Sequence, residues 1–176
     1  MLKKNNAPVK AIYGLDIGGT KMEIGIFSPE LELIMSWRVP TPVDSYSEFL
    51  DSICKLIQEA DKITGAKGSI GIGMPGIIDN NNRVKSANVP CATGHNIADD
   101  LHTLFNREIS VANDCRLFAL SESIGGAGNE LDVVYGAIIG TGAGGGLCIN
   151  GKLLKTVNNI AGEYGHIPAS AMLIQK

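Results

Sequence analysis

The sequence lacks the features of membrane and secreted proteins. It has no apolar stretch approaching the roughly 20 residues that cross a membrane. Its polar first segment, Met1 to Lys10, lacks the apolar run of a signal peptide. The four cysteines are scattered with no Cys-x-x-Cys pair, which favours free thiols over disulfides. We therefore expect a cytoplasmic protein.

Runs of like charge are also missing. The 15 Lys and Arg residues and the 18 Asp and Glu residues are interspersed, and the formal net charge is −3. No basic face is expected, so neither nucleic acid nor a membrane is an expected partner. With 44% hydrophobic and 19% charged residues, the 176-residue chain has the balance of a globular protein of one to two domains.

Glycine, by contrast, is abundant, and its 22 residues cluster in a few short stretches. Clustered glycine indicates tight turns or backbone pressed against a ligand. The Gly-x₄-Gly-Lys-Ser/Thr phosphate loop does not occur in the sequence. Any phosphate site must therefore be built differently.

Periodicity predicts a strand meander followed by alternating helices and strands. The segment Ser45 to Glu48 has the form of a capping box, and Gly65 is typical of a helix end. The predicted strands are 10–17, 22–27, 31–39, 69–74, 108–112, 133–139 and 147–149, and the predicted helices are 45–65, 97–105 and 113–124. This order indicates a mixed α/β sheet.

A domain boundary is expected at Gly125 to Asn129, between a first lobe, 1–125, and a second lobe, 126–176. A weak internal echo supports two lobes, because Tyr13 to Thr20 and Tyr135 to Gly142 each combine a strand with a glycine turn before a second strand. Duplication and coincidence both remain open, since this pattern is common. Two such hairpins facing one another across a cleft would suit a bound nucleotide.

The first glycine turn, Asp16-Ile17-Gly18-Gly19-Thr20-Lys21, joins two predicted strands. Glycine N–H groups approach phosphate oxygens closely, and the Thr20 hydroxyl adds a donor. Asp16, at the end of an apolar strand, needs a cation or a donor, and hydrated Mg²⁺ would serve. The alternative is a plain hairpin turn capped by Asp16.

The second glycine stretch, Gly140 to Gly146, has five glycines in seven residues and is predicted to be a loop between strands. Glycine weakens a strand interior, so this density needs a reason. A second phosphate cradle is one reason, and a flexible surface loop is the alternative.

Asn113-Asp114 follows a predicted strand and precedes a helix. Ligands tend to bind beyond the carboxyl ends of strands, so Asp114 is a candidate general base for an attacking hydroxyl. Asn and Asp are also common helix caps, and on position alone a cap is the stronger interpretation.

Three further polar segments follow predicted strands or turns. In Gly162-Glu163-Tyr164-Gly165-His166, Glu163 and His166 could hydrogen-bond hydroxyl groups, or His166 could bind a metal. Pro75-Gly76 and Asn88-Val89-Pro90 could line the same cleft, although ordinary turn chemistry also explains both.

In this order the segments resemble the ROK family of sugar kinases and sugar-responsive repressors, over nearly the whole chain. The anchors are Asp16 to Lys21, Gly73 to Gly76, Asn113-Asp114, Gly140 to Gly146 and Gly162 to His166. Further segments, Arg38 to Pro42 with Asp44 to Tyr46, and Ala87 to Pro90, look like the N-acetylglucosamine kinase branch. The resemblance implies an actin-like ATPase (ribonuclease H-like) fold, with a complete first lobe and the start of the second.

The resemblance also implies transfer of the ATP γ-phosphate to the 6-hydroxyl of N-acetyl-D-glucosamine, with Mg²⁺ and with Asp114 as general base. The residues it implies as ATP contacts are Gly14, Leu15, Asp16, Ile17, Gly18, Gly19, Thr20, Lys21, Gly142, Ala143, Gly144, Gly145, Gly146, Leu147, Cys148 and Ile149. The sugar-side residues it implies are Gly76, Asn88, Asn113, Glu163 and His166. Members of the family are often homodimers.

The sequence departs from the family in two respects. The family histidine at the place of His166 also ligates Zn²⁺ with cysteines that follow it, and no cysteine follows Cys148 here. Family members also continue beyond the position of Lys176. We therefore expect an incomplete zinc site and a truncated second lobe with exposed strand edges, and consequently a poor kinase.

Three alternatives stand beside an N-acetylglucosamine kinase. Glucokinase or fructokinase activity is the nearest, because few residues separate these substrates. A repressor is disfavoured, since only about ten residues precede the first strand, too few for a helix-turn-helix domain. The third is a non-catalytic remnant of such a kinase.

Overall fold

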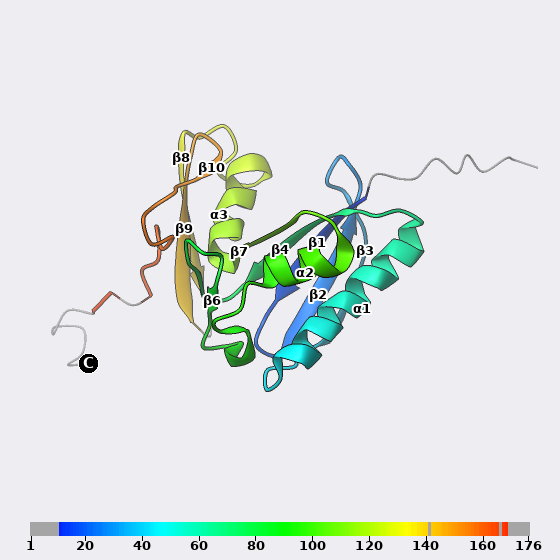
Figure 1. Ribbon diagram of the computed structural model, residues 1–176. Helices are drawn as coiled ribbons and strands as arrows, with labels where there is room; N and C mark the ends of the chain where they lie inside the picture. Colours follow the sequence, from blue (N-terminus) through cyan, green and yellow to red (C-terminus); the bar gives the residue numbers. More distant parts are fainter. Residues whose placement is uncertain (1–10, 141, 166, 169–176) are drawn as a thin grey trace, which may run out of the picture. The chain divides into compact units, whose positions relative to one another are not determined.

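The computed structural model describes residues 11–140, 142–165 and 167–168 (Figure 1). Contacts divide the chain into two compact units, Met1–Asp114 and Cys115–Lys176. The boundary expected from the sequence, at Gly125 to Asn129, lies further along the chain. Helix α3 (Asp114–Gly125) lies between the two positions and packs within the second unit. The predicted division into two lobes stays a prediction.

The first unit is built on a five-stranded mixed sheet with the strand order β3-β2-β1-β4-β7. Its strands are β1 (Ile12–Ile17), β2 (Lys21–Phe27), β3 (Leu33–Pro40), β4 (Ser69–Met74) and β7 (Ile109–Asn113). The β1–β2 and β2–β3 pairs are antiparallel, and the β1–β4 and β4–β7 pairs are parallel. The predicted meander followed by alternation is confirmed. The third strand begins two residues later than predicted, because Leu31 adopts a positive φ of 65°.

Helices α1 (Tyr46–Thr64) and α2 (Ile97–Phe105) lie on the same side of this sheet (Figure 1). The Ser45 hydroxyl accepts a hydrogen bond from the Glu48 N–H at the start of α1, and Gly65 ends the helix with a φ of 67°. The buried side chains of α1 are Phe49, Ile53, Leu56, Ile57 and Ala60, which share one core with alternate residues of β1 and β2. Burying each of the four large side chains, all except Ala60, stabilises the fold by about 1.5–3 kcal/mol. Among the helices of the described residues, none is long and apolar enough to span a membrane.

A segment with little regular structure joins β4 to α2. It contains the two-residue strands β5 (Ile77–Ile78) and β6 (Val84–Lys85), which pair with each other, and the 3₁₀ turn η1 (Pro90–Ala92). Val89 and Ala92 are fully buried in the main core. The segment is therefore packed into the core of the first unit.

The second unit contains α3 and a sheet with the order β10-β9-β8, formed by β8 (Val133–Ile139), β9 (Ala143–Ile149) and β10 (Lys152–Leu153). The prediction of a loop through Gly146 was wrong, because β9 begins at Ala143. A Cβ on Gly146 would lie 2.7 Å from the Arg116 Cα, and one on Gly136 would lie 2.8 Å from the Ala119 Cβ. Glycine is needed here because α3 packs directly on the strand backbone.

Candidate functional site

The turn between β1 and β2 is held by Thr41, which is buried. The Gly18 N–H donates to the Lys21 carbonyl at 2.9 Å and closes the turn. The Thr41 N–H donates to the Thr20 carbonyl at 3.0 Å, and the Thr41 hydroxyl donates to the Gly18 carbonyl at 2.8 Å. Thr41 thus engages two backbone carbonyls of the turn.

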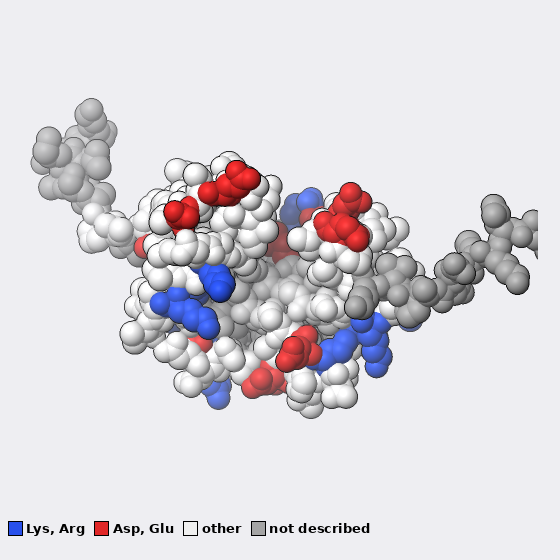
Figure 2. Space-filling view, turned by 90° about the horizontal axis from the view of Figure 1, so that it is seen from above, with Lys and Arg blue, Asp and Glu red and all other residues white. Residues whose placement is uncertain are grey.

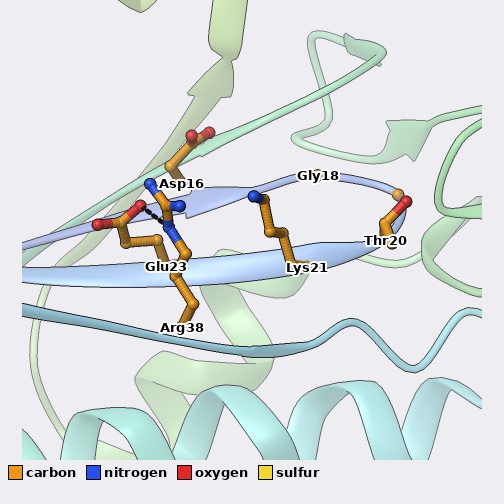
Figure 3. Close-up of a pocket in the computed structure, with 7 residues that line it drawn as sticks. Asp16, Gly18, Thr20, Lys21, Glu23 and Arg38 are labelled. Carbon is orange, nitrogen blue, oxygen red and sulfur yellow. Dashed lines mark hydrogen bonds and ion pairs between the residues drawn. The ribbon is translucent and has the colours of Figure 1, made fainter.

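A row of charged side chains crosses three strands beside this turn. Asp16, Glu23 and Arg38 are direct neighbours in register on β1, β2 and β3. Figure 3 shows them on one side of the hairpin, with Lys21. The Arg38 Nε donates to the Glu23 Oε2 at 2.5 Å. An open pocket of about 250 Å³ is lined by Asp16, Gly18, Gly19, Thr20, Lys21, Glu23 and Arg38.

The pKa values of the two carboxyl groups in this row are shifted in opposite directions. Partial removal from water raises the pKa of Asp16, and the negative charges of Asp114 and Glu23 raise it further, while Arg38 opposes them. The pKa of Glu23 is lowered, first by its hydrogen bond from Arg38. The charge of Glu23 is therefore balanced by Arg38, whereas ionised Asp16 lies among like charges and favours a nearby cation.

The carboxyl ends of the parallel strands meet at one edge of the first unit's sheet. Asp16, Gly73 and Ala112 are neighbours in register across β1, β4 and β7. Asn113 ends β7, and Asp114 follows it as the first residue of α3. Because Asp114 raises the pKa of Asp16 by charge repulsion, the two carboxylates lie within electrostatic reach of each other. This arrangement suits a catalytic base, although the first helical turn also suits a cap.

The Asn113 side chain is buried and connects the candidate base to the turn after β4. Its Nδ2 donates to the Gly76 carbonyl at 3.0 Å and to the Asp114 Oδ1 at 3.1 Å. Gly76 has a φ of 109°, and a Cβ there would lie 2.4 Å from the Lys85 carbonyl oxygen. Only glycine suits position 76, both for its positive φ and for its close contact with Lys85. The Gly76 carbonyl that accepts the hydrogen bond from Asn113 therefore belongs to a turn that requires glycine.

Asn88 lies against the first glycine turn. A Cβ on Gly19 would lie 2.7 Å from the Asn88 carbonyl oxygen, so the two backbones are in close contact. Asn88 is itself exposed. The predicted sugar-side residues Gly76, Asn88 and Asn113 therefore lie in the same unit as the first turn and Asp114.

The other predicted site residues belong to the second unit. Glu163 lies close to β9, because a Cβ on Gly144 would lie 3.3 Å from its Oε2. Two tyrosine hydroxyls hold this segment: Tyr135 donates to the Gly162 carbonyl at 2.9 Å, and Tyr164 donates to the Ile138 carbonyl at 3.1 Å. The stretch Gly142 to Ile149 is mostly strand. His166 lies outside the described residues.

Glu23, Arg38 and Thr41 also belong to the first site, although the sequence did not single them out as site residues. Glu23 alternates with the buried residues Met22 and Ile24, and this alternation was the available signal that it faces away from the core. Arg38 and Thr41 were noted only within a longer segment. Their roles depend on the pairing of β3 with β2, which the sequence does not reveal.

The described residues contain no group of three or more His, Cys, Asp and Glu side chains arranged to hold a metal. Mg²⁺ commonly takes only one or two carboxylates, with phosphate and water completing its shell. Asp16 fits this role, since a cation would relieve its repulsion with Asp114. A zinc site would require His166 and stays a prediction.

On the face shown in Figure 2, Lys and Arg side chains are interspersed with Asp and Glu in small groups. No extended area of one sign covers this view. Lys21 and Arg38 line the pocket and are positive groups that an anionic ligand there would meet.

The profile of the ROK family matches residues 12–174. The chain belongs to the ROK family. It is 48% identical over 159 residues to the N-acetylgalactosamine kinase AgaK of Shewanella sp. (strain ANA-3), a match that covers 90% of this chain and 52% of the relative. It is 44% identical over 163 residues to the N-acetyl-D-glucosamine kinase of Shigella flexneri serotype 5b (strain 8401), with 91% and 54% covered.

A ROK family glucokinase from Streptomyces griseus, solved in complex with glucose and AMPPNP, has a similar structure. The TM-score is 0.78 at 30% identity, covering 91% of this chain and 51% of that one. The predicted ROK membership and actin-like α/β fold are thereby confirmed. The chain spans about half the length of the relatives it matches.

Proposed function

We propose that this ROK protein transfers the γ-phosphate of ATP to the 6-hydroxyl of an N-acetylhexosamine, and that N-acetyl-D-glucosamine is its substrate. Two relatives at 44–48% identity are named as kinases of N-acetylated amino sugars. The branch-like segments, Arg38 to Pro42 with Asp44 to Tyr46, and Ala87 to Pro90, agree with that substrate class. A cytoplasmic location and a homodimer stay predictions.

The observation that carries the proposal is the meeting of Asp16, Asn113 and Asp114 at one sheet edge. In the proposed reaction, the Asp114 carboxylate accepts the proton of the 6-hydroxyl as that oxygen attacks the γ-phosphorus, and ADP leaves. Asn113 donates to Asp114 and orients it. Losing a placed base of this kind costs about 10² to 10⁴ in rate.

The first glycine turn is proposed to receive the phosphates. The N–H groups of Gly19 and Thr20 supply donors, and Lys21 supplies a positive charge at the pocket. Asp16 would hold hydrated Mg²⁺, which when bound neutralises phosphate charge. No other step in the proposal depends on a metal ion.

On the sugar side, Asn88, Asn113 and Gly76 are proposed to contact hydroxyl groups. Glu163 and His166, and the ATP contacts expected in the stretch Gly142 to Ile149, stay predictions. A zinc ion at His166 is proposed only as a property that the family resemblance implies.

The decisive experiment compares initial ATP-dependent rates of the purified protein with different sugars. The panel is N-acetylglucosamine, N-acetylgalactosamine, N-acetylmannosamine, glucose and fructose. We expect the highest kcat/KM with N-acetylglucosamine. N-acetylgalactosamine is the second candidate, because a relative named for it shares 48% identity. Higher efficiency with glucose or fructose would contradict the amino-sugar assignment. Because this chain is expected to be a poor kinase, sugar binding is measured as well, and a protein that neither binds nor phosphorylates any of these sugars would contradict the proposal.

A further inference from the structure

The segment that carries Asn88 has a defined internal structure. We define the Asn88 loop as residues 86–95. Within it, the Val89 N–H donates to the Ser86 Oγ at 3.2 Å, and the Ser86 N–H and carbonyl both bond the Thr93 Oγ1, at 3.2 and 3.1 Å. These bonds define the shape of the loop. They do not by themselves fix its position relative to the glycine turn.

The Tyr46 side chain of α1 contacts both the end of this loop and α2. The Tyr46 ring stacks on the His95 ring, with centroids 3.5 Å apart and planes at 13°. The Tyr46 hydroxyl donates to the Asp100 Oδ2 at 2.5 Å. Burial, and then Asp100, raises the pKa of Tyr46, so the hydroxyl keeps its proton and stays a donor at neutral pH. The Cys91 Sγ adds a weaker contact to the Pro42 carbonyl at 3.5 Å.

The Asn88 loop also contacts the first glycine turn, through Asn88 and Gly19. Their backbones are close enough that a Cβ on Gly19 would lie 2.7 Å from the Asn88 carbonyl oxygen. A small shift of the Asn88 loop would therefore either open this contact or press on the glycine turn. Holding a binding loop in one place lowers the ordering cost that a ligand must otherwise overcome.

We propose that Tyr46 and His95 are positioning residues that hold the Asn88 loop, so that Asn88 stays beside the Gly18-Gly19 turn. The consequence for sugar binding rests on the proposed function, whereas the holding of the loop does not. Both segments were noted for branch-like sequence, Tyr46 at the start of α1 and Asn88 in the loop.

The kinetic test uses His95→Ala, which removes the stacking partner, and His95→Phe, which keeps an aromatic ring. An aromatic pair of this kind corresponds to a roughly 2- to 10-fold change in affinity. We therefore expect His95→Ala to raise the KM for the sugar by about that factor, with kcat and the KM for ATP nearly unchanged. His95→Phe should restore most of the sugar KM. A proportionate rise in both KM values, or an unchanged sugar KM, would contradict the proposal.

A second test needs no activity. Amide hydrogen exchange of the unliganded protein should be about 2- to 10-fold faster at Val84, Val89 and Ala92 in His95→Ala, and unchanged in β1. The control variant is His102→Ala, whose ring contacts the Arg107 carbonyl rather than the loop. Unchanged exchange in the loop would overturn the proposal. If faster exchange is found in a protein that binds no sugar, the holding of the loop stands and the proposed function fails.

If His95→Ala does not fold, Tyr46→Phe replaces it in both tests. This variant keeps the ring and loses only the hydrogen bond to Asp100. Faster loop exchange with a higher sugar KM supports the proposal. Faster exchange with an unchanged sugar KM, in a protein that does phosphorylate the sugar, shows a merely structural contact and overturns it.

Discussion

The β1–β2 and β8–β9 hairpins share a local sequence pattern but use it in different surroundings. Each has a Tyr-Gly pair in its first strand, and each of these glycines lies opposite another glycine, Gly14 opposite Gly25 and Gly136 opposite Gly146. The tyrosines differ: Tyr13 is fully buried, whereas Tyr135 is 50% exposed. The shared pattern therefore specifies a hairpin but does not determine how deeply its first strand is buried.

The glycines of the two hairpins also serve different purposes. In the first hairpin the close backbone contact is in the turn, at Gly19. In the second, the close contacts are in the strand, where Gly146 receives α3. Gly140 and Gly142, before that strand, have no neighbouring atom within 4 Å of an added Cβ. The two glycine clusters therefore differ in what their backbones contact, and a phosphate site at the second cluster stays a prediction.

The largest expected effect is at the sheet edge beside the first hairpin. Asp114→Asn should lower kcat by about 10² to 10⁴, because the amide cannot accept the hydroxyl proton. ATP affinity should be retained. The matched control is Asp51→Asn, an exposed position on α1. Turnover is measured by ADP release. Near-normal turnover in Asp114→Asn would contradict the role of Asp114 as general base.

The second hairpin is tested by a pair of glycine variants. Gly146→Ala should lower the free energy of unfolding by about 1–3 kcal/mol, because its Cβ would overlap α3. Gly140→Ala has open space and should change it by less than about 0.5 kcal/mol. Urea denaturation measures both. Equal losses in the two variants would show that strand packing does not explain the glycine run.

The first hairpin is tested by the corresponding pair in its turn. Gly19→Ala should displace the Asn88 backbone and weaken sugar and ATP binding by roughly tenfold, about 1.4 kcal/mol. Gly18→Ala should have a smaller effect, since its Cβ would lie 3.2 Å from the Lys21 carbonyl oxygen. Isothermal titration of each ligand distinguishes the two. If Gly18→Ala were the more damaging, the contact with Asn88 would not be the reason for glycine at position 19.

The smallest expected effect is the pH dependence of Asp16. Its raised pKa means that the folded state binds the proton more tightly than the unfolded state, so its ionisation lowers stability as pH rises above about 4. Asp16→Asn should therefore be more stable than the wild type at pH 7, by less than about 1 kcal/mol because the site is exposed. The difference should vanish below about pH 4. Melting temperatures of the variant and the wild type, measured between pH 4 and pH 7, give this difference in stability. If Asp16→Asn were less stable than the wild type at pH 7, the expected direction would be wrong.

Much of the fold could be predicted from local signals. Ser45 and Gly65 define both ends of α1 by cap chemistry, and the alternation of Met22, Ile24 and Ile26 defines β2. The start of β9 could not be predicted, because glycine at 144–146 disfavours a strand locally. Packing against α3 overrides that preference.

The candidate site was predicted in part. Asp16 and Asp114 were identifiable because the first lies at the end of an apolar strand and the second directly after one, where ligands tend to gather. Thr41 and Arg38 were not identifiable, since their roles depend on the register of β3 against β2 and on the path of the turn. Contacts between segments distant in the sequence carry no local signature.

The sequence by itself determined most of the longer helices and strands of this protein, the glycine turn after Asp16 and the family to which the chain belongs, because caps, periodicity and short motifs act over a few residues. Only the tertiary structure decided that Asp16 lies within electrostatic reach of Asp114, that Asn88 rests on Gly19, and that the glycines of β9 receive a helix. Strand order and register produce these contacts, and both depend on the packing of the unit as a whole rather than on any one segment.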